Sequence, residues 1–241
     1  MSTYVLVHGS WHTGDLWEGV AEPLRAQGHA VHTPTVAGHG KGVDKAVNHD
    51  DCVASIVDHI VGQDLTDIVL LGHSFGGTVI ARVAEEIPDR IRRLVFWNAF
   101  VPAPGNCLDD ETPPHYRELF AQLAASTDDD TIMLPFPIWR EAFIQDAPLE
   151  LAQSTYALLS PEPAQPFRDK LALTRFYELQ IPRSYINATE DIALPPGEWG
   201  WHPRMSSRLG MYRLVQLPGS HEVMFTDPGL LAQKIVEAGR D

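Results

Sequence analysis

Short apolar runs alternate with amphipathic helical patterns along most of this chain, and this alternation limits the folds open to it. Six runs are predicted to be strands: Tyr4–Val7, His29–Thr33, Ile68–Leu71, Arg93–Trp97, Arg183–Asn187 and Tyr212–Gln216. Runs that are apolar on both faces are typical of parallel strands with helices on each side. The sequence therefore predicts a six-stranded, mainly parallel, doubly wound α/β sheet with a right-handed crossover at each step.

Helical spacing of apolar residues fills the segments between these runs. It covers Leu16–Ala26, Val53–Val61, Phe75–Ile87 and a last helix that starts after Asp227. Asp227 is expected to be the N-cap of that last helix, with Pro228 at the first helical position, where the missing N–H is tolerated. Pro23 lies inside the first of these segments, so we expect it to kink or break that helix.

One long stretch departs from this rhythm. From Ala103 to about Leu179 no run reads as a convincing strand, although aromatic and proline residues are frequent. Helical spacing occurs there in patches, and two acidic runs, Asp109–Glu111 and Asp128–Asp130, are expected to form a solvated face. An insertion of short helices, apolar inside and acidic outside, fits this pattern best.

The charge of the chain argues against several classes of partner. Its 241 residues carry 18 Lys and Arg against 32 Asp and Glu, a formal net charge of −14. Such a charge opposes binding to nucleic acid or to an anionic membrane. No apolar run approaches the roughly 18 residues that a membrane span requires, and the first residues show no secretory signal. We therefore expect a soluble, cytoplasmic protein in which Cys52 and Cys107 are buried, unpaired and without a metal.

The strongest chemical signal is the run Gly72-His73-Ser74-Phe75-Gly76-Gly77. It directly follows a predicted strand and opens a predicted helix, which is the setting of a nucleophile elbow. The flanking glycines allow a strained turn and a close approach of the helix to the neighbouring strands. Ser74 would then point out at the carboxyl ends of the strands, where open α/β sheets bind their ligands.

A serine hydroxyl needs a base to become a nucleophile. His221 is the candidate, because it lies in a loop after the last predicted strand and the chain order in such enzymes is serine, acid, histidine. The acid should follow the strand Arg183–Asn187, where Glu190 and Asp191 both could serve, and Asp191 is favoured. It would orient the imidazole and stabilise its protonated form.

The loop after the first strand supplies the remaining element. The backbone N–H groups of Ser10 and Phe75 are expected to form an oxyanion hole. His8 and His12 are spaced like zinc ligands, but that spacing requires a helix, which is not expected there. Without a metal-ligand set or a phosphate-binding motif, the predicted chemistry needs no metal and no cofactor.

These motifs together resemble a known family. The run V-L-V-H-G-S-W-H (5–12), the elbow, N-A-F-V-P (98–102) and A-T-E-D (188–191) resemble the α/β-hydrolase fold, and within it the methylesterase and hydroxynitrile lyase branch. The resemblance implies a core formed by residues 1–102 and 181–241 and a helical cap formed by residues 103–180. It also implies the triad of Ser74, Asp191 and His221, with Ser10 and Phe75 as the oxyanion pair.

The sequence also departs from relatives of this fold. Lyases of the branch have a threonine where Ser10 stands, and a lysine, which stabilises cyanide, where Glu222 stands. Cofactor-independent dioxygenases of the fold have an aspartate after the strand that follows the elbow, where this chain reads Trp97-Asn98-Ala99-Phe100. Both departures disfavour these activities.

The interpretation is therefore a serine hydrolase that cleaves a small to medium, hydrophobic or aromatic carboxylic ester or lactone through an acyl-enzyme. Trp11, His12 and Trp139 are expected in its substrate pocket. The alternatives are a lyase, elimination or cofactor-independent oxygenase step on a secondary metabolite at the same serine and histidine, and a binding module without turnover. The expected partner is a small-molecule substrate, and a homodimer is left open.

Overall fold

The computed structural model describes residues 1–240 and contains the six predicted strands in one parallel sheet, in the order β2-β1-β3-β4-β7-β8. The strands are β1 (Thr3–Val7), β2 (Ala30–His32), β3 (Ile68–Ser74), β4 (Ile91–Ala99), β7 (Arg183–Ala188) and β8 (Arg213–Leu217). Every neighbouring pair in this sheet is parallel, so the predicted fold class is confirmed. The carboxyl ends of the strands consequently meet at one edge.

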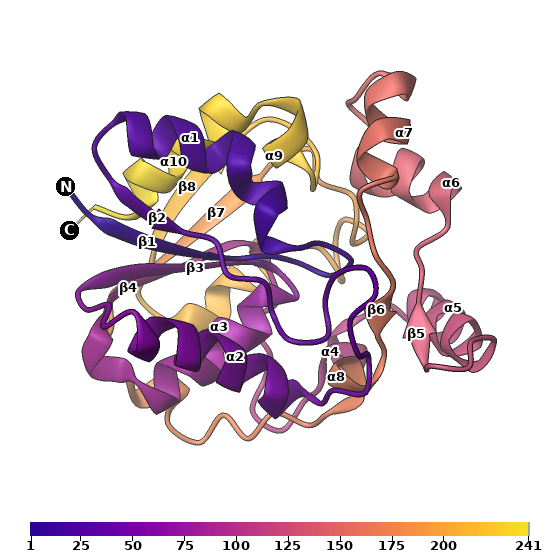
Figure 1. Ribbon diagram of the computed structural model, residues 1–241, viewed down its shortest axis with the longest axis horizontal. Helices are drawn as coiled ribbons and strands as arrows, with labels where there is room; N and C mark the ends of the chain where they lie inside the picture. The colour runs from indigo at the N-terminus through magenta and orange to yellow at the C-terminus, as the bar shows by residue number, and fades with distance from the viewer. Residues whose placement is uncertain (241) are drawn as a thin grey trace.

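Helices cover both faces of the sheet, as Figure 1 shows. α1 (Glu18–Ala26) and α10 (Pro228–Ala238) lie on one face, and α2 (His49–Gly62) and α3 (Gly76–Glu86) on the other. β1 contributes to the hydrophobic core on both faces of the sheet. Val5 and Val7 pack in the core with α2 and α3. Tyr4 and Leu6 pack in the core with α1 and α10. A strand buried on both faces explains the continuous apolar run in the sequence.

Two helix predictions have different outcomes. Asp227 caps α10 as expected, since its side chain accepts a hydrogen bond from the Leu230 N–H at 3.0 Å. Pro23 neither breaks nor ends α1, which continues to Ala26 after a 3₁₀ turn over Gly14–Trp17. The missing proline N–H costs one helical bond, but Pro23 lies on the partly exposed side of a helix whose buried stripe packs on the sheet.

The inserted segment is mainly helical and lies at the edge where the strands end (Figure 1). Its helices are α4 (Leu108–Glu111), α5 (Pro114–Ala125), α6 (Phe136–Ile138), a π-helical turn (Trp139–Phe143), α7 (Leu149–Tyr156), α8 (Gln165–Arg168) and a 3₁₀ turn (Phe176–Glu178). It also contains an antiparallel pair of two-residue strands, β5 (Thr131–Ile132) and β6 (Glu162–Pro163), so the expectation of no strand there was wrong. Two residues are too short to show periodicity in a sequence. The boundaries at residues 102 and 180 stay a prediction.

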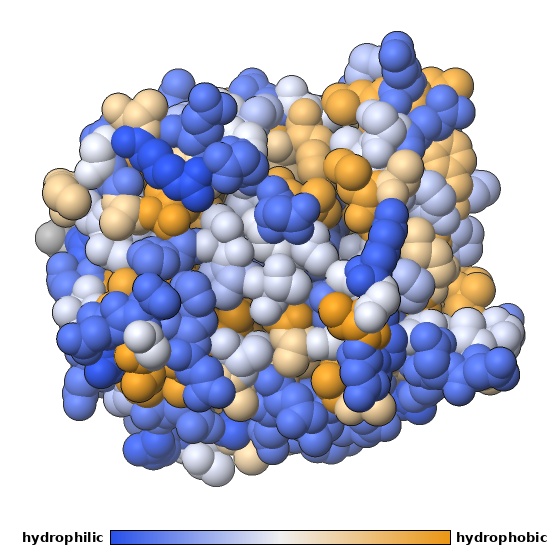
Figure 2. Space-filling model, in the orientation of Figure 1, coloured by the Kyte–Doolittle hydropathy of each residue, from blue (hydrophilic) through white to orange (hydrophobic). Residues whose placement is uncertain are grey.

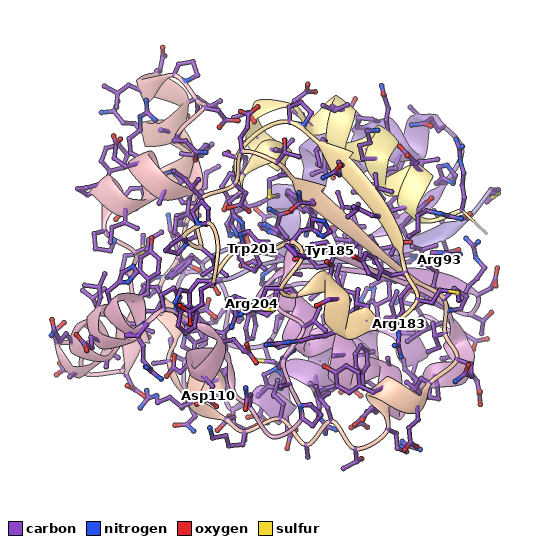
Figure 3. All side chains as sticks on the ribbon, turned by 180° about the vertical axis from the view of Figure 1, so that it is seen from behind. Arg93, Asp110, Arg183, Tyr185, Trp201 and Arg204 are labelled. Atoms are coloured by element: carbon purple, nitrogen blue, oxygen red, sulfur yellow. The ribbon has the colours of Figure 1, made fainter. Side chains whose placement is uncertain are left out.

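The first acidic run is only partly a solvated face. Glu111 is 1% exposed and its carboxylate pairs with Arg204 at 2.7 Å and with Arg208 at 2.9 Å. Figure 3 shows Arg204 on the side of the sheet that faces the inserted segment, near Asp110 of α4. The pairing ties α4 to the segment between β7 and β8, which explains why a carboxylate is buried there.

The surface and the cysteines agree with an ordinary globular chain. Over residues 1–240 no helix has both the length and the apolarity needed to cross a bilayer. Cys52 and Cys107 are buried and free, as predicted. Figure 2 shows a mostly hydrophilic face over the core, with apolar residues more frequent over α6 and α7. Leu149, the first residue of α7, and Leu158, two residues after its end, are among the exposed ones.

His49 gives the fold a testable pH dependence. Burial lowers the pKa of this histidine from 6.5 to about 4. Below pH 6.5 His49 therefore binds a proton in the unfolded chain but not in the folded protein, so the free energy of unfolding decreases as the pH falls. His49 alone should remove about 2 kcal/mol from the free energy of unfolding between pH 7 and pH 5.

Urea unfolding of the wild type and of His49→Gln at both pH values measures this contribution. A glutamine can keep the contact with Thr78, which lies 2.9 Å from His49 Nε2, without titrating. We expect the decrease in the free energy of unfolding between pH 7 and pH 5 to be smaller in this variant by about 2 kcal/mol. The exposed His115→Gln on α5 is the control and should match the wild type. Equal losses in the His49→Gln variant and the wild type would contradict the assignment.

Candidate active site

The turn between β3 and α3 holds Ser74 in a strained backbone conformation. Its φ of 52° lies in the left-handed region, which costs a residue with a side chain on the order of 1 kcal/mol or more. Two glycine contacts fix this turn. A Cβ on Gly72 would lie 2.5 Å from the carbonyl oxygen of Gly76, and one on Gly77 would lie 2.3 Å from that of Phe100. The helix can therefore start directly behind Ser74 only with glycines at these positions.

The loop after β1 packs directly on this serine. A Cβ on Gly9 would lie 3.0 Å from Ser74 Cβ, so a larger residue there would press on the nucleophile. The backbone N–H groups of Ser10 and Phe75 have no acceptor among residues 1–240. Free N–H groups beside a serine at a helix N-terminus are suited to bind a developing oxyanion.

Asp191 and His221 are joined directly. His221 Nδ1 lies 2.6 Å from Asp191 Oδ2, and both side chains are almost fully buried. The ring therefore donates from Nδ1 and has Nε2 available as a proton acceptor. Glu190, the other candidate acid, is exposed, so Asp191 is the one of the two carboxylates that contacts His221.

His221 lies against the walls of the cavity into which Ser74 opens. Its ring stacks on Trp201 with centroids 5.1 Å apart and meets Phe143 edge-on at 5.3 Å. Figure 3 shows Trp201 between the sheet and the inserted segment, at the opposite end of the sheet from Arg93 and Arg183. Within residues 1–240 the Ser74 hydroxyl makes no hydrogen bond to His221, and such bonds often tighten only when substrate binds.

A second imidazole beside His221 carries no charge. His73 is buried, stacks on Trp97 with centroids 3.9 Å apart and lies 4.5 Å from the His221 ring. Burial, with a smaller contribution from His221, lowers the pKa of His73 well below its ordinary value. The His73 ring is therefore neutral at pH 7 and adds no positive charge beside His221.

Asn98 is a residue of this site that sequence reasoning missed. Its side-chain amide donates to Asp191 Oδ2, the oxygen that also accepts from His221, and its own oxygen accepts the Ala188 N–H at 2.7 Å. The Ala193 N–H donates to the other Asp191 oxygen at 2.8 Å. The available signal was its place directly after the predicted strand Arg93–Trp97, and in the structure it is the penultimate residue of β4, which neighbours β7. Asn98 has a φ of 33°, a region that asparagine tolerates better than most residues.

Ser74 opens into a small apolar cavity of about 30 Å³. Its walls are Ser10, Trp11, Ser74, Phe100, Leu108, Thr112, Tyr116, Phe120, Phe143, Phe167, Ala193, Leu194 and Trp201. This volume holds little more than a water molecule or two. Several of the side chains that form its walls, among them Phe120, Phe143 and Phe167, belong to the inserted segment.

Trp11 lines the cavity as predicted, but His12 and Trp139 lie outside its lining. Trp139 is fully buried inside the inserted segment, where its indole N–H donates to the Ala152 carbonyl at 3.1 Å. His12 is 2% exposed and its Nε2 lies 3.1 Å from the Glu222 carboxylate. The sequence pattern could not distinguish side chains that line a cavity from those packed behind its wall.

The model of the alpha/beta hydrolase family matches residues 4–234. The chain belongs to this family. A solved structure described as an extracellular alpha/beta-hydrolase from a Paenibacillus species, with structural and functional homology to tobacco salicylic acid-binding protein 2, is 45% identical with a TM-score of 0.98, and both chains are covered completely.

Curated relatives of this α/β-hydrolase include two bacterial enzymes. The carbendazim hydrolyzing esterase of Nocardioides sp. (strain SG-4G) is 30% identical over 99% of this chain and 100% of that protein. The pyrethroid hydrolase of Sphingobium wenxiniae is 28% identical over 97% of this chain and 86% of that protein. Methylesterase 8 and the alpha-hydroxynitrile lyase of Arabidopsis thaliana match at 25% and 24%, so the predicted branch is confirmed.

The contact between Asn98 and Asp191 in this α/β-hydrolase can be tested with Asn98→Asp, which keeps the side-chain shape. At pH 8 the new carboxylate no longer donates and repels Asp191, so kcat/KM for a p-nitrophenyl ester should fall roughly 10- to 100-fold. At lower pH a protonated carboxyl can donate again, so the ratio to wild type should recover.

Asn48→Asp at the N-cap of α2 is the matched control, because aspartate caps a helix as well as asparagine does. Its kcat/KM should equal that of the wild type at every pH. An Asn98→Asp enzyme with a constant ratio to wild type across the pH range would show that this amide does not act on Asp191.

Proposed function

We propose that this chain hydrolyses small to medium, neutral, hydrophobic or aromatic carboxylic esters or lactones through an acyl-enzyme on Ser74. The chain is an ester hydrolase of the α/β-hydrolase family, as its esterase and hydrolase relatives support. The observation that carries the finer proposal is the buried hydrogen bond from His221 to Asp191, at the same strand edge as a strained serine with two free N–H groups beside it.

The mechanism follows from what each group can donate or accept. His221 Nε2 takes the proton from Ser74 as Oγ attacks the ester carbonyl, and Asp191 stabilises the resulting imidazolium. The N–H groups of Ser10 and Phe75 bind the oxyanion. His221 then gives its proton to the leaving alcohol, which departs as the carbonyl re-forms. Water, deprotonated by His221, attacks the acyl-enzyme in the same way and releases the acid.

The cavity supports a neutral, ring-bearing substrate. Its walls carry aromatic and aliphatic side chains with a few hydroxyl groups and no charged side chain. An ionised group placed there would lose its hydration without gaining a counter-ion. The relatives that are named as hydrolysing a pyrethroid or carbendazim support a small-molecule substrate.

The lyase and oxygenase alternatives gain no support from the site. Glu222 stands where lyases of the branch have a lysine, and it is fully buried against His12, away from the cavity lining. The region where the dioxygenases have an aspartate reads Trp97-Asn98-Ala99-Phe100 and contains no carboxylate. Neither the cation that stabilises cyanide nor the second carboxylate is therefore supplied at these positions.

The remaining expectations also stay proposals. We propose that the protein acts in the cytoplasm on a small molecule without a nucleic-acid or membrane partner, with a homodimer left open. A strong negative net charge supports the absence of polyanionic partners. The Paenibacillus relative is described as extracellular, so fractionation of the producing cells is the measurement for location.

Active-site labelling tests the nucleophile. A fluorophosphonate probe should modify Ser74 alone, as mapped by mass spectrometry. Ser74→Ala should abolish labelling, and His221→Ala should lower both labelling and p-nitrophenyl butyrate turnover by about 10⁴-fold or more. Ser154→Ala on the exposed side of α7 is the control and should behave as wild type. A folded wild type that stays unlabelled would refute the nucleophile and leave the lyase, oxygenase or binding alternatives.

Substrate charge tests the pocket. Phenyl butyrate and the monophenyl ester of succinate have acyl chains of similar length, and only the second is anionic at pH 8. We expect kcat/KM for the anionic ester to be at least roughly 10-fold lower, because its carboxylate must be desolvated in an apolar cavity. Raising the salt concentration should recover little of this difference, since screening acts on long-range repulsion only. Equal values for the two esters would contradict an uncharged pocket.

A further inference from the structure

Two buried carboxylates lie beside the site without a part in the mechanism above. Glu162 and Glu222 are both 0% exposed. Glu162 lies 3.0 Å from His39 Nε2, and Glu222 lies 3.1 Å from His12 Nε2. Burying a carboxylate lowers the stability of the fold unless the group is paired and hydrogen-bonded, so each of these positions needs an explanation.

Both carboxylate–histidine pairs meet at a single peptide unit, the one between Ser10 and Trp11. Its N–H donates to Glu162 Oε2 at 2.8 Å, and its carbonyl oxygen lies 2.6 Å from His12 Nδ1. A carbonyl oxygen can only accept, so Nδ1 of His12 carries a proton. Glu162 thus binds the N–H of this peptide and His12 binds its carbonyl oxygen, while Glu222 contacts the other ring nitrogen of His12.

The charge state of His12 agrees with this arrangement. Burial alone would lower the pKa of His12, but the charge and hydrogen bond of Glu222 outweigh burial and raise it. With a proton on both ring nitrogens, His12 can donate to the Ser10 carbonyl and to Glu222 at the same time. Glu222 therefore keeps His12 in the doubly protonated form, which donates a hydrogen bond to the Ser10 carbonyl.

Trp11 needs such a hold because its backbone is strained. Its φ is 64°, in the left-handed region that a tryptophan rarely adopts. The inserted segment holds this residue at two further points. The indole N–H donates to the Ile132 carbonyl of β5 at 2.9 Å, and the Trp11 carbonyl accepts from the Ser160 N–H at 2.9 Å. Glu162 itself belongs to β6, so both strands of the small β5–β6 sheet contact the loop after β1 directly.

We propose that Glu162 and His12, the latter supported by Glu222, are positioning residues that aim the Ser10 N–H at the oxyanion. The proposal rests on the hydrolase mechanism above. The Ser10 N–H, which is unpaired and beside Ser74, belongs to the preceding Gly9–Ser10 peptide. That peptide shares the Cα of Ser10 with the held peptide, and its Gly9 carbonyl accepts the His12 N–H at 3.4 Å, so a shift of the held peptide or of His12 displaces the Ser10 N–H as well. The inserted segment is then part of the catalytic machinery as well as a cover over it.

The Glu162 contact predicts a specific order among variants. In Glu162→Gln the amide oxygen can still accept from Trp11 while its NH₂ is on the side of His39, so kcat should fall by less than roughly 10-fold. In Glu162→Leu the Trp11 N–H has no acceptor, and kcat should fall by about 10²–10³-fold, as for loss of one oxyanion donor. KM should change by less than about threefold in both variants, because the contact acts in the transition state.

Glu85→Leu is the matched control. Glu85 is also a buried carboxylate, 3% exposed, and accepts two backbone N–H groups of the inserted segment, those of Arg175 and Phe176. It lies near the far end of α3 from Ser74. All rates are normalised to active sites titrated with the fluorophosphonate. Glu85→Leu is expected to lower stability and the fraction of active sites, but to keep the wild-type kcat per site.

Binding of a transition-state analogue separates positioning from a structural role. A phenyl trifluoromethyl ketone adds to Ser74 and places an oxyanion in the hole, so its inhibition constant should rise in proportion to the loss of kcat/KM across the variants. His12→Ala should lose binding of the ketone, and His12→Asn, whose NH₂ can reach the Ser10 carbonyl, should recover most of it. This second pair decides the question if Glu162→Leu does not fold.

The outcomes distinguish this proposal from the mechanism on which it rests. Wild-type enzyme without labelling or turnover would remove the hydrolase mechanism itself. Active wild type together with Glu162→Leu and His12→Ala enzymes that keep the wild-type kcat per site and the wild-type inhibition constant would overturn the positioning roles alone.

Discussion

The left-handed backbone of Ser74 is the constraint on which the rest of this structure depends. It turns the chain from β3 into α3 within one residue, and it directs the serine side chain toward the carboxyl edge of the sheet. The turn is possible only because Gly72 and Gly77 allow backbone approaches that any Cβ would block. The core layers on both faces of the sheet supply the packing that holds this strain.

The strands, the main helices and the elbow could be predicted because their signals are local. A continuous apolar run, a helical stripe or a serine between glycines is visible within ten residues of sequence. The catalytic order along the chain then indicated His221, and the carboxylate after β7 followed from position. The sequence favoured Asp191 over Glu190, and in the structure Asp191 contacts His221 whereas Glu190 is exposed.

The missed features depend on contacts between distant parts of the chain. Asn98 reaches an aspartate 93 residues later, and Glu162 reaches Trp11 across 151 residues. Glu111 looked like part of a solvated acidic run until the arginines between β7 and β8 were placed beside it. Trp139 was expected in the pocket because it is aromatic, yet its surroundings place it behind the wall. Contacts between residues so far apart in the chain leave no periodic pattern in the sequence, so they could not be predicted from it.

The residue after His221 has a consequence for how this scaffold can change its chemistry. Glu222 is the counter-ion of His12, and both are sealed from solvent. Exchanging Glu222 alone for the lysine of the lyase branch would remove the counter-ion of His12 and place a buried ammonium beside its ring, so His12 would lose its second proton. The charges at positions 12 and 222 are therefore coupled, and a cation at one of them requires a neutral or anionic group at the other. A change of chemistry at the residue after His221 consequently also changes the hold on the loop that carries Ser10.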